Sequence, residues 1–239
     1  MPKVKAFSAP HPKDRLSREQ YRELRAWLLD NDPDATKMVT WASHEIGAPQ
    51  TPEQMASQII WIILCAGRNA QAARTIEGKV WTAIHAGKPV VEAFGHRGKA
   101  AAIEQAWSDR LDLFTSLQSV VEAREVGALV AWCGDRPYVG DATKFQLAKN
   151  FGAQICKPDI WLCRLAGIPD VPHRASKITF PVCMQLCNYL GAEVGDNPAV
   201  VDSVLWLACN KGILRVGNDA GPVKFSPQVS KMRSIFEAG

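Results

Sequence analysis

The sequence predicts an all-α protein, and three observations support this fold class. Helix-start signals recur along the chain, apolar residues follow helical spacing, and strand signals are scarce, which together indicate about ten helices. With 239 residues the chain can bury a large core, in one domain or in two lobes. We expect residues 1–15 to be a flexible N-terminus and residues 16–239 to form a single helical domain.

The helix starts combine a capping side chain with a second signal close behind it. Ser17 and Gln20 have the spacing of a capping box, which predicts a helix through about Leu29. Thr51 precedes Pro52 and has Gln54 three residues later. The same order of cap and proline recurs at Asn197-Pro198 and Ser226-Pro227.

Apolar spacing supports helices between these starts. Met55, Ile59 and Ile62 lie three or four residues apart, as the buried face of a helix requires. Two short runs, Pro89–Ala93 and Lys177–Val182, have β-like composition. Neither is followed by the regular hairpin or βαβ spacing that would predict a sheet.

Composition narrows the classes of protein to consider. Hydrophobic residues make up 47% and charged residues 22% of the chain, as in ordinary globular proteins. No apolar run reaches the roughly 18 residues of a membrane span, and the N-terminus lacks the apolar region of a secretory signal. We therefore expect a cytoplasmic protein without a membrane partner. The net charge of +4 is compatible with a nucleic-acid partner but does not require one.

The seven cysteines are interpreted as free core thiols. Their odd number argues against a complete disulfide framework. The spacing from Cys156 through Cys163 and Cys183 to Cys187 is too open for a compact iron–sulfur loop. We expect no metal site.

The most informative stretch is Trp132–Gly167. It predicts a helix that ends near Cys133, a glycine-containing turn at residues 137–140, and a second helix over about residues 141–150. A further helix is expected to start at Lys157-Pro158-Asp159. A tight glycine turn lets backbone N–H groups approach a phosphate, and the following helix N-terminus adds unpaired N–H groups.

This segment resembles the hairpin of helix-hairpin-helix DNA glycosylases, whose pattern is Leu-Pro-Gly-(Val/Ile)-Gly-x-x-Thr-Ala. The matching residues are Pro137, Val139, Gly140 and Thr143. Tyr138 replaces the first glycine, so we expect a distorted hairpin or a different hold on the phosphate. Asp159 and Arg164 occupy the places of the family's catalytic aspartate and structural arginine.

Two upstream segments extend the resemblance. Residues 94–100 (FGHRGKA) resemble the family's Gly-(Tyr/Phe)-x-x-x-Lys-Ala segment. Residues 62–71 occupy the place of the Ile-Leu-Ser-x-Gln segment, whose loop supplies a residue that wedges into the duplex. The resemblance implies a two-lobed fold with the active site between the lobes and the hairpin at about residues 134–152. It places the catalytic aspartate in residues 157–165.

The implied partner is double-stranded DNA with a flipped modified base, bound by a monomer. The expected DNA contacts are Pro137, Tyr138, Val139, Gly140, Thr143, Lys144, Arg68, Asn69 and Gln71. For Arg68, Asn69 and Gln71 the alternative is a solvated helix end. The base-pocket candidates are Lys157, Trp61 and Trp161, although most tryptophans at helical spacing belong to the core. Lys157 could also lower the pKa of Asp159, bind a phosphate or point to solvent.

Asp159 is the implied catalytic carboxylate, although an aspartate after proline is often only a helix cap. Bifunctional members carry a Schiff-base lysine where this chain has Ala142, so we expect a glycosylase without lyase activity. Lys144 lies roughly 200° around the helix from that position. No cofactor is expected, and the one ion considered is a monovalent cation at the hairpin.

The Lys157-Pro158-Asp159 form is most similar to a divergent branch associated with phage DNA hypermodification. The resemblance therefore favours excision of a modified, bulky phage-type base. One alternative is a transferase that modifies a hypermodified thymine without excision, and another is a non-catalytic DNA-binding module. A phage, host or anti-phage defence origin stays open.

Overall fold

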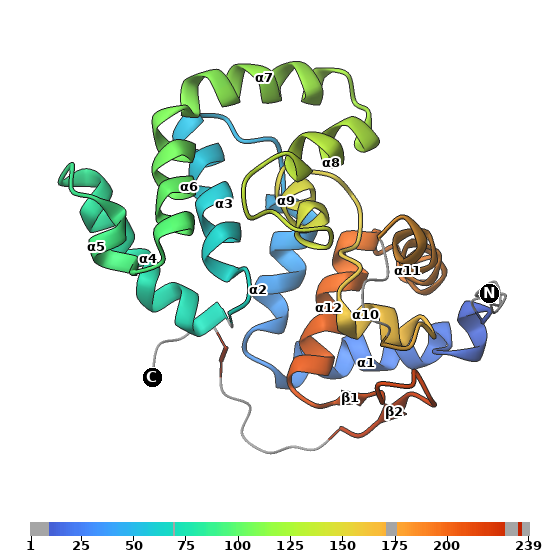
Figure 1. Cartoon of the computed structure of the whole chain (residues 1–239). Coiled ribbons are helices and arrows are strands. Elements are labelled where there is room, and N and C mark those ends of the chain that lie inside the picture. Colours follow the sequence, from blue (N-terminus) through green and yellow to red (C-terminus); the bar gives the residue numbers. More distant parts are fainter. Residues whose placement is uncertain (1–9, 69, 171–175, 228–233, 236–239) are drawn as a thin grey trace, which may run out of the picture. The chain divides into compact units, whose positions relative to one another are not determined.

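The computed structural model describes residues 10–68, 70–170, 176–227, 234 and 235, and it confirms the all-α class. Within these residues there are twelve α-helices, two short η helices and two strands of two residues each. The elements in chain order are η1 Pro12–Asp14, α1 Arg18–Asn31, α2 Ala35–Thr40, η2 Trp41–Glu45, α3 Pro52–Cys65, α4 Ala70–His85, α5 Val90–Phe94, α6 Arg97–Ser108, α7 Arg110–Glu122, α8 Val126–Gly134, α9 Thr143–Asn150, α10 Ile160–Leu165, α11 Ser176–Gly191, α12 Pro198–Asn210, β1 Leu214–Arg215 and β2 Lys224–Phe225 (Figure 1).

Three of the predicted helix starts are confirmed atom by atom. The Ser17 hydroxyl accepts the Gln20 N–H while the Gln20 side chain accepts the Ser17 N–H, which completes the capping box of α1. Thr51 caps α3, and Asn197 caps α12 by accepting two backbone N–H groups. The residues that follow Ser226-Pro227 lie outside the described residues.

Both β-like runs are helical. Residues 90–94 form α5, and Lys177–Val182 lies inside α11, which includes Pro181. The small antiparallel pair of β1 and β2 instead aligns Leu214 with Phe225. Short apolar runs do not distinguish a strand from a helix by composition alone, and within these two runs only Val90 and Thr179 are buried.

The chain divides into two compact units. Unit 1 comprises residues 1–45 and 154–234, and unit 2 comprises residues 46–153 and 235–239. The expected flexible segment 1–15 is described only from Pro10, where η1 forms and the Arg15 guanidinium donates to the carbonyls of Arg164, Leu165 and Gly221. Arg15, within the expected flexible segment, is therefore held by hydrogen bonds to the rest of unit 1.

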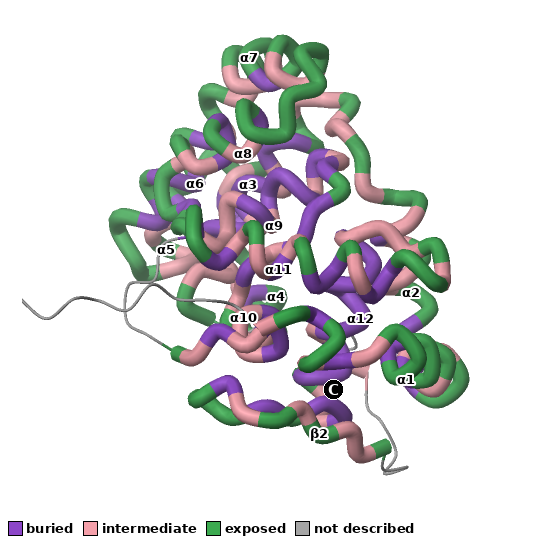
Figure 2. Tube along the Cα trace, turned by 90° about the vertical axis from the view of Figure 1, so that its right-hand side faces the viewer, coloured by how far each residue is buried: buried purple, intermediate pink, exposed green. Residues whose placement is uncertain are grey.

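Unit 1 is organised around α12. Ten of its thirteen residues are buried, because α2, α10 and α11 all pack against it. In Figure 2 this helix is drawn largely as buried. A helix that is apolar on every side can be stable only inside such a core. The one charged residue among its buried positions is Asp202.

Unit 2 is organised around α3, which carries seven buried residues and contacts α4, α6, α7 and α9. Helices α8 and α9 pack against each other as the two arms of the predicted hairpin. Within the described ranges, no helix is long and apolar enough to span a membrane.

Candidate active-site carboxylate and nucleic-acid interface

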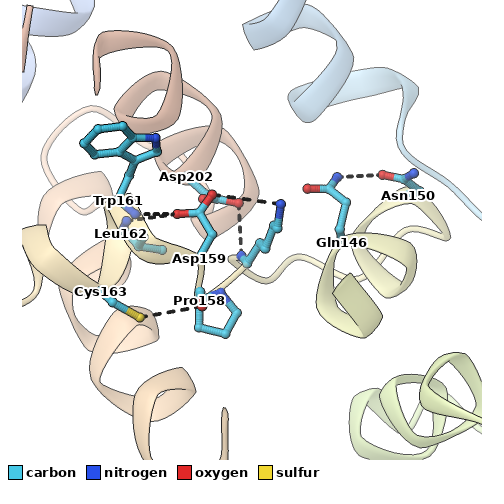
Figure 3. Close-up of polar contacts among 9 residues, drawn as sticks. Gln146, Asn150, Pro158, Asp159, Trp161, Leu162, Cys163 and Asp202 are labelled. Carbon is cyan, nitrogen blue, oxygen red and sulfur yellow. Dashed lines mark hydrogen bonds and ion pairs between the residues drawn. The ribbon is translucent and has the colours of Figure 1, made fainter. Parts of the chain in front are cut away.

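Asp159 is the N-cap of α10. Its Oδ1 accepts the backbone N–H groups of Trp161 and Leu162, each at 3.0 Å, so the side chain is fixed in orientation (Figure 3). The side chain is 15% exposed. Capping thus engages one carboxylate oxygen through the helix N-terminus, which also stabilises the negative charge.

The second oxygen of Asp159 faces a lysine. Lys157 Nζ lies 3.9 Å from Asp159 Oδ2, at the outer limit of an ion pair, and the lysine side chain is 25% exposed. Of the alternatives for Lys157, the structure therefore shows the pairing with Asp159. The Lys157 ammonium thus places a positive charge beside the Asp159 carboxylate.

The backbone around Asp159 forms a tight turn. The Asp159 N–H donates to the Lys157 carbonyl at 2.7 Å, and the Lys157 N–H donates to Asp202 Oδ2 at 3.0 Å. The Cys163 thiol lies 3.6 Å from the Pro158 carbonyl, which it contacts as a weak donor (Figure 3). Proline fixes its own φ angle, so Pro158 transmits the position of Lys157 to Asp159.

Arg164 links α10 to two other segments of unit 1. Its guanidinium binds Asp170 through two contacts, of 2.9 and 2.5 Å, and its backbone carbonyl accepts from Arg15. Hydrogen bonding by Arg164 lowers the pKa of the Asp170 carboxyl. The Arg164 guanidinium also lies over the Trp161 ring, with its Cζ atom 5.2 Å from the ring centroid.

The hairpin in unit 2 turns through Tyr138, which has φ +61°. Glycine adopts this left-handed conformation easily, whereas for other residues it costs about 1–2 kcal/mol. The tyrosine that replaces the expected glycine thus keeps a glycine-like backbone, and the turn closes with Val139 N–H donating to the Arg136 carbonyl.

The N–H groups of the hairpin differ in availability. The Gly140 N–H donates to Thr143 Oγ1 at 2.7 Å, so it is already engaged. The N–H groups of Ala142 and Thr143, at the start of α9, have no hydrogen-bond partner among the described residues. These groups, rather than the expected Gly140 N–H, are therefore positioned to bind an anion.

Lys144 and Asp141 form an ion pair within the hairpin. Their Nζ and Oδ1 atoms lie 2.5 Å apart, and the same ammonium lies 5.4 Å from the Phe145 ring centroid. Val139 is 8% exposed, so it anchors the turn in the core instead of facing a ligand. Helix α9 begins at Thr143, two residues later than predicted.

A row of four side chains joins three loops of unit 2; we call it the aromatic row. Arg68 lies over the Phe94 ring at 4.6 Å, Phe94 stacks on His96 with centroids 6.1 Å apart, and the Tyr138 ring meets the edge of His96 at 5.9 Å. Tyr138 is 44% exposed. The loop after α3, the 94–100 segment and the hairpin thus meet in one surface of rings and a cation.

The Lys99 side chain contacts the loop that carries Arg68. The lysine is 7% exposed, and its Nζ donates to the Ala66 carbonyl at the C-terminal end of α3. Desolvation by burial, and then the nearby Arg68 charge, lower the pKa of Lys99. A cation at a helix C-terminus is favourable, so this residue fixes the loop that carries Arg68.

The remaining candidates are Gln71, Asn69, Trp61 and Pro137. Gln71 is exposed on α4, and Asn69 lies outside the described residues. Trp61 packs under Arg74 of α4, 4.7 Å from ring centroid to guanidinium, which favours a structural role. Pro137 is exposed in the turn.

The cysteines are thiols without disulfide bonds, and among the described residues no group of three or more histidine, cysteine or acidic side chains is arranged to hold a metal. The four cysteines whose spacing is too open for an iron–sulfur loop include the close pair Cys163 and Cys183, with sulfurs 3.9 Å apart. Their proximity comes from the packing of α10 on α11, which sequence spacing does not encode.

Comparisons with protein-family models, curated proteins and solved structures found no match to the chain.

Sequence reasoning missed three residues that the structure places at these sites. Asp202 and His96 did not stand out in the sequence, and Lys99 did so only as part of a motif. A lone aspartate in the apolar run of residues 198–209 was the available signal for Asp202, because a buried charge requires a partner. No local signal pointed to His96.

Proposed function

We propose that the protein is a monofunctional DNA glycosylase that cleaves the N-glycosidic bond of a modified base and leaves an abasic site. The proposal includes the two-lobed helix-hairpin-helix glycosylase-like architecture that the sequence resemblance implies. The observation that carries it is the Asp159 carboxylate, which is ionically paired, mostly buried and held in orientation by its cap.

Asp159 is suited to the charge that develops in this reaction. As the bond from C1′ to the base breaks, the sugar acquires oxocarbenium character, which a nearby carboxylate stabilises. The Oδ2 atom is the one that is not used in capping, and it can also orient and deprotonate the attacking water. The cap prevents the side chain from rotating away during the reaction.

Lys157 then has a supporting role. Its ammonium places a positive charge beside the Asp159 carboxylate in a partly buried setting. Because the separation is 3.9 Å, the contact is loose enough for Lys157 to turn to a DNA phosphate when substrate binds. Such a movement would uncover Oδ2 at the moment when the sugar needs it.

The groups in unit 2 supply two kinds of DNA contact. The N–H groups of Ala142 and Thr143 suit a phosphate, which positions the duplex without reading its sequence. The aromatic row offers ring faces and a guanidinium, which suit bases exposed when one nucleotide is flipped.

Two observations favour hydrolysis without strand cleavage. Ala142 has no amine for a Schiff base, and Lys144 is held in an ion pair with Asp141. A lysine stabilised as ammonium is a poor nucleophile. We therefore expect that borohydride traps no covalent adduct with abasic DNA. The preference for a bulky phage-type base rests on the sequence alone, through Tyr138 and Lys157-Pro158.

The test compares wild type, Asp159→Asn and a control, Asp112→Asn, which alters an exposed carboxylate of α7. Each protein is incubated with duplexes that carry a series of modified bases, and products are identified by mass spectrometry and alkali cleavage. Wild type and Asp112→Asn should release free base and create alkali-labile sites. Asp159→Asn should lose at least about 100-fold in rate, because a preorganised electrostatic group contributes on this scale.

The products also separate the alternatives. A mass gain on an intact nucleotide would identify a base-modifying transferase. Binding without any product would identify a DNA-binding module. An Asp159→Asn protein with wild-type release of base would refute the assignment of the carboxylate.

A further inference from the structure

The segment that leads to Asp159 is extended but has no strand partner among the described residues. Residues 154–158 run between α9 and α10, with Ile155 and Cys156 buried. Backbone N–H groups in such a segment need acceptors, because an unpaired buried donor is strongly destabilising. Side chains of two helices of unit 1 provide them.

Each N–H group from residue 156 to residue 159 can be accounted for. The Cys156 N–H donates to Met184 Sδ of α11 at 3.4 Å, and the Lys157 N–H donates to Asp202 Oδ2 of α12 at 3.0 Å. Proline has no N–H, and the Asp159 N–H closes the turn onto the Lys157 carbonyl. The contact from Asp202 is therefore the last external support before the candidate catalytic residue.

Asp202 is an unusual residue for this position. It is 3% exposed and is the one charged residue among the buried positions of α12. Burying a carboxylate costs free energy unless hydrogen bonds or a charged partner compensate for the lost hydration. A neutral acceptor could satisfy one N–H group at lower cost, whereas a charged acceptor makes a shorter and stronger bond.

We propose that Asp202 is a positioning residue: its buried carboxylate holds the Lys157 amide and thereby fixes the turn from which the Asp159 carboxylate and the Lys157 ammonium project. This role rests on the proposed function, since it concerns the groups that would act on the nucleotide. Asp202 itself touches backbone and not substrate. Its effect reaches Asp159 through the rigid Pro158.

The test uses three variants in the full-length protein. Asp202→Ala removes the acceptor, and Asp202→Asn keeps an oxygen of similar geometry without the charge. Ser203→Ala is the matched control, because Ser203 is 2% exposed on the same helix and its hydroxyl donates to the Ala199 carbonyl within α12. Both alanine variants should lower stability, but only one removes a contact to the turn.

Two measurements are made at a temperature where all variants are folded. The first is hydrogen exchange of the Lys157 amide by NMR, which should accelerate on the order of tenfold in Asp202→Ala and stay unchanged in Ser203→Ala. The second is base release. Asp202→Ala should lower kcat on the order of 10- to 100-fold with KM for DNA unchanged, since small displacements of a catalytic group have effects of this size. Asp202→Asn should recover most of that loss.

The outcomes separate this inference from the proposed reaction. Unchanged exchange of the Lys157 amide in Asp202→Ala would show that the Asp202 contact does not stabilise the turn. Faster exchange with unchanged kcat would show that this contact does not position Asp159. Equal losses of kcat in Asp202→Ala and Ser203→Ala would reduce the role to general stability. A wild-type protein with a protected Lys157 amide but no product on any duplex would refute the proposed reaction; Asp202 would then be only a structural clamp.

Discussion

The Tyr138 ring occupies space that a side chain at Gly98 would need, and substitution of Gly98 tests this dependence. Gly98 is the second residue of α6, and a Cβ added there would overlap Tyr138 Oη and lie 3.2 Å from Tyr138 Cζ. The Tyr138 side chain is 44% exposed, so its ring can swing aside. We therefore expect Gly98→Ala to displace the ring from His96 without unfolding the protein.

The magnitude follows from two opposing terms. Replacing a helical glycine by alanine stabilises a helix by about 0.5–1 kcal/mol. Displacing Tyr138 loses an edge contact with His96, at about 0.5–1.5 kcal/mol, and strains the new rotamer by a similar amount. Gly98→Ala should thus destabilise the wild-type protein by about 1 kcal/mol but stabilise a Tyr138→Gly protein by about 0.5 kcal/mol.

The assay is a double-mutant cycle measured by urea unfolding. Wild type, the two single variants and the double variant should give a coupling free energy of about 1.5 kcal/mol. Gly78→Ala is the control, since Gly78 lies within α4 and a Cβ added there would have no atom within 4 Å, so it should stabilise both backgrounds equally. A coupling below about 0.5 kcal/mol would refute the reasoning, because independent sites already reach that value.

Two further predictions concern ion pairs of unit 1. The Lys211 ammonium lies 3.0 Å from both Asp32 and Asp34, and all three side chains are less than a tenth exposed, so Lys211→Met should lower the free energy of unfolding by about 3–5 kcal/mol. Urea unfolding measures this, and a loss below about 1 kcal/mol would contradict it. The lowered pKa of Asp170 means that its pairing with Arg164 stabilises the fold above the unfolded-state pKa of about 4 and is lost as pH falls through the folded-state value. Arg164→Met should therefore show a flatter fall of Tm between about pH 5 and pH 2 than wild type, and parallel curves would show that the pair contributes no pH dependence.

The parts of the fold that the sequence predicted are those set by local contacts. Ser17, Thr51 and Asn197 cap helices because each side chain bonds N–H groups two or three residues away. The hairpin and the cap at Asp159 are local in the same sense. The run Lys177–Val182 was ambiguous because its composition suits either a strand or a helix, and the structure includes it in α11.

The supports of the candidate site could not be predicted in this way. Lys99 reaches the Ala66 carbonyl across 33 residues, and Lys157 reaches Asp202 across 45. Such contacts depend on how helices pack, which periodicity does not specify. The one signal in the sequence is a charge at an apolar helix position, as at Asp202, which indicates that a distant partner exists.

The two departures from the glycosylase pattern each have a compensating residue that the pattern lacks. Tyr138 stands where a glycine is expected, and the absence of a side chain at Gly98 makes room for its ring. Lys157 brings a cation beside Asp159, and Asp202 fixes the backbone from which that cation projects. When its neighbours accommodate a substituted residue, that residue has a defined position. Recognition of a particular nucleotide requires side chains with defined positions. If the proposed function holds, the departures are therefore better candidates for substrate choice than the residues that match the pattern.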